Sequence, residues 1–141
     1  MTLFETIVYH NNETLFIPYK DGQRLTAAMS HWRDLPAATQ PETLAEWAFH
    51  IYNADLEQLE RERSGPDGEL AFLNAYVYRL LGLRSLSVGD VLAVTADTGR
   101  TRWLACETLG WRRMTPPPNT SGRPLPAQQV CARLRVGGTG R

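Results

Sequence analysis

Cysteine, lysine and long apolar runs are scarce in this sequence, and each scarcity excludes a class of protein. The only two cysteines, Cys106 and Cys131, lie in different segments without C-x-x-C or Cys/His spacing, so neither a zinc site nor a disulfide framework is predicted. No apolar run is long enough to span a bilayer, and the first residues lack the basic and apolar regions of a secretion signal. We therefore expect a cytoplasmic protein with reduced structural thiols, no metal, no cofactor and no membrane partner.

Lys20 is the only lysine, and the charged residues are unevenly distributed along the chain. Residues 1–70 contain five basic and twelve acidic residues, a net charge of −7, whereas residues 71–141 contain ten basic and three acidic residues, a net charge of +7. Either the halves neutralise each other, within one chain or in a head-to-tail homodimer, or the basic half binds an anionic partner such as nucleic acid. A GC-rich genome also favours arginine over lysine, so arginine content alone does not indicate phosphate binding.

The first half of the chain predicts one hairpin followed by amphipathic helices. β-rich runs on both sides of residues 10–13 predict the hairpin, because asparagine tolerates the positive φ of a tight turn. Helical spacing predicts a short helix between Gly22 and Pro36, and another that begins at Pro41 and resumes after residue 55. A third helix is predicted from Asp67, its N-cap, to a stop at Gly82, with a strand as the alternative for this segment. The spacing in the first of these helices comes from Leu25, Ala28, Met29 and Trp32.

The second half predicts another hairpin and a proline-rich extension. Residues 90–95 and 101–106 alternate as strands around Gly99, which suits the left-handed position of the turn, and apolar residues on both strand faces predict cover on both sides. The fold class is therefore α+β: a small antiparallel sheet from two hairpins packed on two or three helices, in a single domain over 1–115. Residues 116–141 are expected to form a connector that wraps this domain or pairs with a neighbouring molecule, followed by either an edge strand over 128–136 or a disordered tail.

The stretch RSLSVGDVL, residues 84–92, contains S-x-S-x-G and so invites comparison with a serine nucleophile elbow. An elbow needs a strand before the serine and a helix after it, whereas this stretch has the reverse order. No histidine is placed to act as a base for Ser87 or Cys106, and burial in a strand would raise the thiol pKa of Cys106. We therefore predict no catalytic residue, with thiol or serine chemistry at these two residues as an alternative. Gly89 and Asp90 are predicted to form a turn in which Asp90 binds nearby backbone donors.

Two motifs between residues 84 and 113 follow a recognisable pattern. Residues 84–91 fit the pattern R-S-L/M-S-V-G/S-D-V. Residues 103–111, WLACETLGW, fit a second pattern in which an aromatic residue is followed first by A-C and then by G-W. The chain here resembles the YodL-like family and related small actinobacterial proteins carried on plasmids, phages and integrated elements. The resemblance implies an accessory protein of a mobile genetic element and supplies no catalytic residue. Its motif positions, to which we assign a structural role, include Arg84, Ser85, Ser87, Gly89, Asp90 and Gly110.

Tryptophans and arginines gather in and just after the second predicted hairpin. Alternation along a strand would place core tryptophans on one face and solvated arginines on the other, whereas rings interleaved with guanidinium groups would suit stacking on single-stranded nucleic acid. Our leading hypothesis is a non-enzymatic interaction module that binds an unidentified protein partner through this surface and the extension. Nucleic-acid binding by the arginine-rich half is the alternative. The residues of this candidate surface are Trp103, Trp111, Arg100, Arg102, Arg112 and Arg113.

Overall fold

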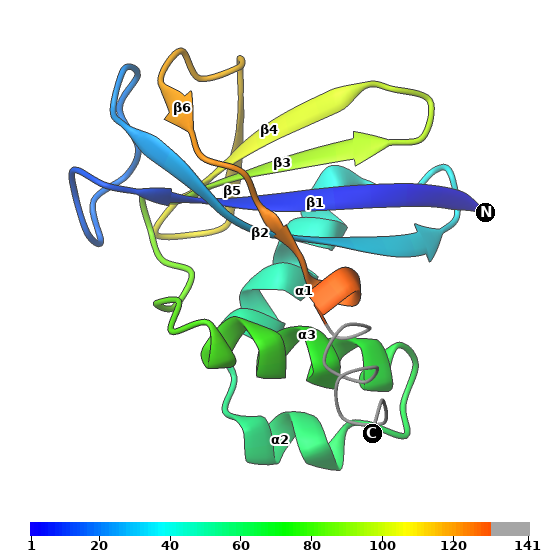
Figure 1. Ribbon diagram of the computed structural model, residues 1–141. Coiled ribbons are helices and arrows are strands. Elements are labelled where there is room, and N and C mark those ends of the chain that lie inside the picture. Colours follow the sequence, from blue (N-terminus) through cyan, green and yellow to red (C-terminus); the bar gives the residue numbers. More distant parts are fainter. Residues whose placement is uncertain (131–141) are drawn as a thin grey trace.

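The computed structural model describes residues 1–130 and shows an α+β fold in which helices lie on one side of a mixed sheet (Figure 1). The sheet order is β5-β4-β3-β1-β2-β6, and β7 also pairs with β2. Neighbouring strands from β5 to β2 are antiparallel, whereas β6 and β7 run parallel to β2. The strands are β1 (Thr2–Asn11), β2 (Leu25–Leu35), β3 (Val91–Ala96), β4 (Thr101–Cys106), β5 (Trp111–Met114), β6 (Thr120–Ser121) and β7 (Leu125–Pro126).

Residues 25–35 form strand β2, so the helix predicted between Gly22 and Pro36 is wrong. Burial along β2 follows the two-residue period of a strand, and two of its buried side chains are the polar His31 and Arg33. The guanidinium of Arg33 lies 4.0 Å from the ring centroid of Trp47 and donates to Asp67 at 2.8 Å. Because these inward residues are polar, the apolar pattern alone showed helical spacing instead of alternation.

The second strand predicted for the first hairpin is wrong. Asn11, the last residue of β1, pairs with Leu25 of β2, so residues 12–24 form a loop in place of the tight turn and strand expected there. Strand β1 also pairs with β3, which joins the two halves of the chain in one sheet. The small sheet of two hairpins is therefore replaced by a larger mixed sheet.

The helices are α1 (Pro41–Asn53), α2 (Leu56–Arg61) and α3 (Gly68–Leu80). The predicted start at Pro41 is confirmed, and α3 is a helix, not the alternative strand. The stop at Gly82 is also confirmed, because its φ is +70° and the next N–H donates back to the carbonyl of Tyr78 at 3.3 Å. Asp67 occupies the N-cap position, but its carboxylate pairs with Arg33 instead of capping α3.

The hairpin of β3 and β4 forms as predicted, with Gly99 at φ +93° in its turn. One face contributes Leu92, Val94 and Leu104 to the core beneath the helices. The opposite face contributes Val91 and Ala105 to a second, smaller cluster. The prediction of cover on both faces is confirmed, and Figure 1 shows the helices on the first of them.

The proline-rich segment runs beside β2. Its two short strands, β6 and β7, pair in parallel with the outer edge of β2, and the following Ala127 is fully buried in the main core. Residues 127–130 are helical. The edge strand predicted over 128–136 is therefore wrong at its start, and the rest of it lies outside the described residues.

His31 is the most deeply buried ionisable group of β2. Its Nδ1 lies 2.8 Å from the hydroxyl of Tyr52, and its ring packs edge-on against Trp47 at 5.2 Å. Burial, with a smaller contribution from the charge of Arg33, lowers the pKa of His31 to about 3. The folded protein therefore keeps this imidazole neutral.

Acidification should destabilise the fold through His31. Between its unfolded pKa near 6.5 and its folded pKa of about 3, only the unfolded chain takes up the proton, so stability falls as the pH drops through that window. The expected loss from this residue is about 2 kcal/mol by pH 5. In denaturant unfolding at pH 7 and pH 5, His31→Gln should lose about 2 kcal/mol less than the wild type. Equal losses in the two proteins would contradict a buried neutral His31.

Candidate functional site

The carboxylate of Asp90 is buried where the RSLSVGD segment enters β3. Its side chain is 1% exposed and accepts four hydrogen bonds. Arg84 donates two of them, at 2.7 and 2.8 Å, and the backbone N–H groups of Ser87 and Asn11 donate the others at 2.8 and 2.9 Å. The predicted bonding of Asp90 to backbone donors is confirmed, and both carboxylate oxygens are satisfied.

Asn11 carries this network into the loop after β1. Its Oδ1 accepts from the N–H groups of Glu13 and Thr14, at 2.9 and 3.2 Å, and its Nδ2 donates to the carbonyl of Gly89 at 3.1 Å. Arg84 donates to the carbonyl of Asn11 at 3.2 Å. The sequence marked this asparagine only as a turn former, because its partners are 73 to 79 residues away in the chain.

Gly89 is the point where the loop rests on the motif. Its φ is +100°, and a Cβ placed on it would lie 2.4 Å from the backbone carbonyl oxygen of Ile17. Any other residue would therefore meet both backbone strain and a backbone clash. The glycine of the motif allows residues 84–90 and the loop to pack in direct contact.

Three consecutive apolar side chains lie exposed in this loop. Leu15, Phe16 and Ile17, which we term the apolar tip, are 49%, 68% and 50% exposed. Phe16 has φ +65°, a left-handed conformation that costs a bulky residue about 1–2 kcal/mol. Beyond the tip, Tyr19 is buried in the smaller cluster and its carbonyl accepts from Arg112 at 3.2 Å. The tip is therefore held on both sides.

The tip was not among the predicted site residues. Its sequence was assigned to the second strand of the first hairpin, because Leu-Phe-Ile is rich in β-formers. Consecutive apolar residues do not exclude a strand, since Val91 to Val94 are also apolar and form β3, so no local signal separated the two cases.

The predicted surface of tryptophans and arginines is divided between the two faces of the sheet. Trp103 packs on Tyr9 at 5.5 Å on the face away from the helices, whereas Trp111 packs on Phe49 of α1 at 6.4 Å. Arg112 and Arg113 likewise lie on opposite faces of the sheet. Arg112 contacts the carbonyl of Tyr19, Arg113 pairs with Glu42 of α1 at 2.6 Å, and Arg100 and Arg102 lie on the side of Arg113.

Ser87 and Cys106 show no activation for nucleophilic chemistry. The Ser87 hydroxyl donates to the carbonyl of Ser85 at 3.2 Å, so it is bonded within its own turn. Cys106 is buried, and burial together with the charges of Asp90, Glu46 and Glu107 raises its pKa to about 12. The described hydrogen-bond partners of the three histidines are Tyr78 for His10, Tyr52 for His31 and Glu62 for His50.

Within residues 1–130, no three His, Cys, Asp or Glu side chains are grouped so that they would hold a metal ion. No helix in that part of the chain combines the length and apolar character needed to cross a membrane. No family model, curated protein or solved structure matches the chain. The resemblance to the YodL-like family therefore stays a prediction.

Replacing Gly89 should separate backbone strain from steric clash. Gly110, in the turn between β4 and β5, also has a positive φ, +78°, but no atom lies within 4 Å of its added Cβ. Gly110→Ala should therefore cost about 1 kcal/mol, and Gly89→Ala at least about 3 kcal/mol, because only the latter also displaces the loop. Denaturant unfolding measures both. Similar losses for the two variants would show that the contact between Gly89 and Ile17 contributes nothing.

Proposed function

We propose that this protein is a non-enzymatic interaction module that binds a partner protein through its apolar tip. The observation that carries the proposal is the exposed Phe16 at φ +65° in a loop held on both sides. Exposure and backbone strain each cost free energy, and the fold gains little from a ring that is 68% exposed. An accessory role in a mobile genetic element, which the family resemblance implies, is part of this proposal.

The loop is built so that binding requires little additional ordering. Asn11 fixes the backbone before the tip, Gly89 lies against the carbonyl of Ile17, and the buried Tyr19 fixes the backbone after it. A preordered loop loses less conformational entropy on association than a flexible one. The tip therefore has the character of a rigid anchor.

The chemistry of the tip defines the partner surface. An aromatic side chain between two aliphatic ones fits an apolar pocket, which is where binding energy concentrates at interfaces. Glu13 and Arg24 pair with each other at 3.5 Å near the base of the loop, so the rim is polar without a strong net charge. We expect a partner with an apolar pocket and a mixed polar rim.

Phe16→Asn tests whether the ring serves the fold or a partner. Asparagine tolerates the left-handed region and removes the exposed ring, so the variant should be as stable as the wild type or up to about 1 kcal/mol more stable. Denaturant unfolding gives the comparison. A loss of more than about 1 kcal/mol would show that Phe16 is a packing residue and would remove the main support for the proposal.

Site-specific crosslinking tests binding directly. A photoreactive phenylalanine analogue at position 16 of the full chain, expressed in its host, should capture one defined protein, whereas the same analogue at position 109 should not. Leu109 is a matched control because it is 92% exposed in another turn. Once purified, that partner should bind Leu109→Asn like the wild type and bind Phe16→Asn about ten-fold more weakly or worse. Unchanged affinity for Phe16→Asn would contradict the proposal.

A further inference from the structure

A cleft lined by arginines opens at the end of the sheet opposite the apolar tip. It has a volume of about 260 Å³ and lies between the turn joining β3 and β4 and the segment that leads into α1. Phe4, Val94 and Ala96 form an apolar wall on the helix-covered face. The cleft is also lined by Arg100, Arg102 and Arg113, and Arg102 is the cross-strand neighbour of Val94. We term this the arginine cleft.

Two of the three guanidinium groups have no carboxylate partner within residues 1–130. Arg113 donates to both oxygens of Glu42, at 2.6 and 2.9 Å, so its charge is neutralised. By contrast, the guanidinium groups of Arg100 and Arg102 make no hydrogen bond or ion pair with any other residue among 1–130. Arg102 is also partly buried, where an unpaired guanidinium is less well solvated than at the surface.

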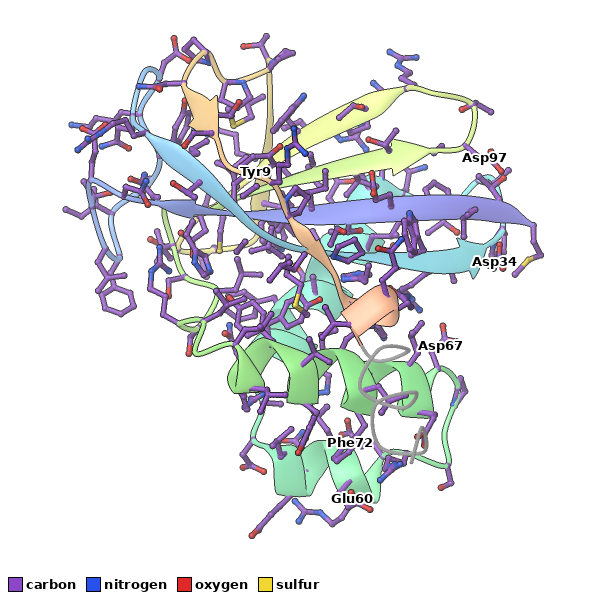
Figure 2. All side chains as sticks on the ribbon, viewed as in Figure 1. Tyr9, Asp34, Glu60, Asp67, Phe72 and Asp97 are labelled. Carbon is purple, nitrogen blue, oxygen red and sulfur yellow. The ribbon has the colours of Figure 1, made fainter. Side chains whose placement is uncertain are left out.

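Neighbouring carboxylates do not supply the missing charge. Asp97 and Asp34 lie at this end of the sheet (Figure 2). Asp97 is engaged by the backbone N–H of Leu3 at 3.3 Å and does not line the cleft. Arg33 points toward Trp47 of α1, so its neighbour Asp34 points to the opposite face of the sheet. Counting the described residues, the cleft therefore keeps an excess of about two positive charges.

We propose that the arginine cleft binds the phosphate group of a small phosphate monoester. Such a group carries a charge of about −1.5 to −2 at neutral pH, which matches the two unpaired guanidinium groups, and its oxygens fit their fork of donors. The cleft is below the usual range of about 300–1,000 Å³ for ligand pockets, so it suits one compact group. Phe4, Val94 and Ala96 would contact the apolar part of the ester.

The arrangement of arginines favours this ligand over the backbone of a nucleic acid. Binding along a nucleic-acid strand requires a continuous basic groove with exposed aromatic rings on which the bases stack. Arg112 lies on the opposite face of the sheet and Arg84 is bound to Asp90, so neither extends the cleft into such a groove. Internal phosphodiesters also carry a single negative charge each, which would leave part of the positive charge unmatched.

Calorimetric titration with phenyl phosphate and phenyl sulfate tests the charge match. The two probes share the ring and the tetrahedral head, but only phenyl phosphate approaches a charge of −2 near pH 7.5. We expect one site for phenyl phosphate, with an affinity at least about five-fold higher than for phenyl sulfate. Equal affinity for the two probes, or no saturable binding of phenyl phosphate, would overturn the proposal.

Arginine variants locate the site. Arg102→Gln should weaken phenyl phosphate binding about ten-fold. Arg102→Lys keeps the charge but not the fork of donors, so its affinity should fall between those of the wild type and Arg102→Gln. Arg123→Gln is the matched control. Arg123 is exposed and lies outside the cleft, and its side chain has no partner among the described residues. Equal weakening by Arg102→Gln and Arg123→Gln would contradict the assignment. Because the Arg102 side chain has no hydrogen-bond or ion-pair partner among residues 1–130, its variants should stay folded, which circular dichroism verifies.

A single-stranded oligonucleotide without terminal phosphates distinguishes the nucleic-acid alternative. The proposal predicts that Arg102→Gln does not change any binding of this probe. Salt-dependent binding that is lost in Arg102→Gln would overturn the proposal in favour of recognition of the nucleic-acid backbone.

Discussion

The ion pair between Asp90 and Arg84 is the interaction on which the arrangement of the loop depends. A buried carboxylate is costly unless its charge and its lone pairs are satisfied, and here Arg84 and two backbone N–H groups satisfy both oxygens. Those donors come from the end of β1 and from the turn before β3. The pair therefore fixes two segments that are far apart in sequence, and through Asn11 it orders the loop that carries the apolar tip.

The fold separates its two candidate binding sites. The apolar tip follows the last residue of β1, and the arginine cleft includes Phe4 near the start of the same strand, so the sites lie at opposite ends of the sheet (Figure 1). Within the part of the chain that the structure describes, ion pairs neutralise the uneven charge only in part. Among the ion pairs within residues 1–130, Arg113 with Glu42 is the one that joins the basic half to the acidic half.

Local signals in the sequence predicted the local structure. Pro41, Gly82 and Gly99 marked a helix start, a helix end and a hairpin turn because each acts through its own backbone conformation. Strand β2 was mistaken for a helix because its inward His31 depends on Tyr52, a partner from another element. The pairing of β1 with both β2 and β3, and the exposed position of Phe16, likewise depend on long-range contacts that composition and periodicity do not encode.

Native-state hydrogen exchange of Asp90→Asn tests the central claim most directly. If the carboxylate orders the loop, the amides of Glu13 and Thr14, whose acceptor is Asn11, should exchange at least about ten-fold faster relative to those of α1 than in the wild type. Using α1 as the internal reference separates loss of the loop from general destabilisation. An unchanged ratio between loop and α1 amides would contradict the dependence of the loop, and of the apolar tip, on Asp90.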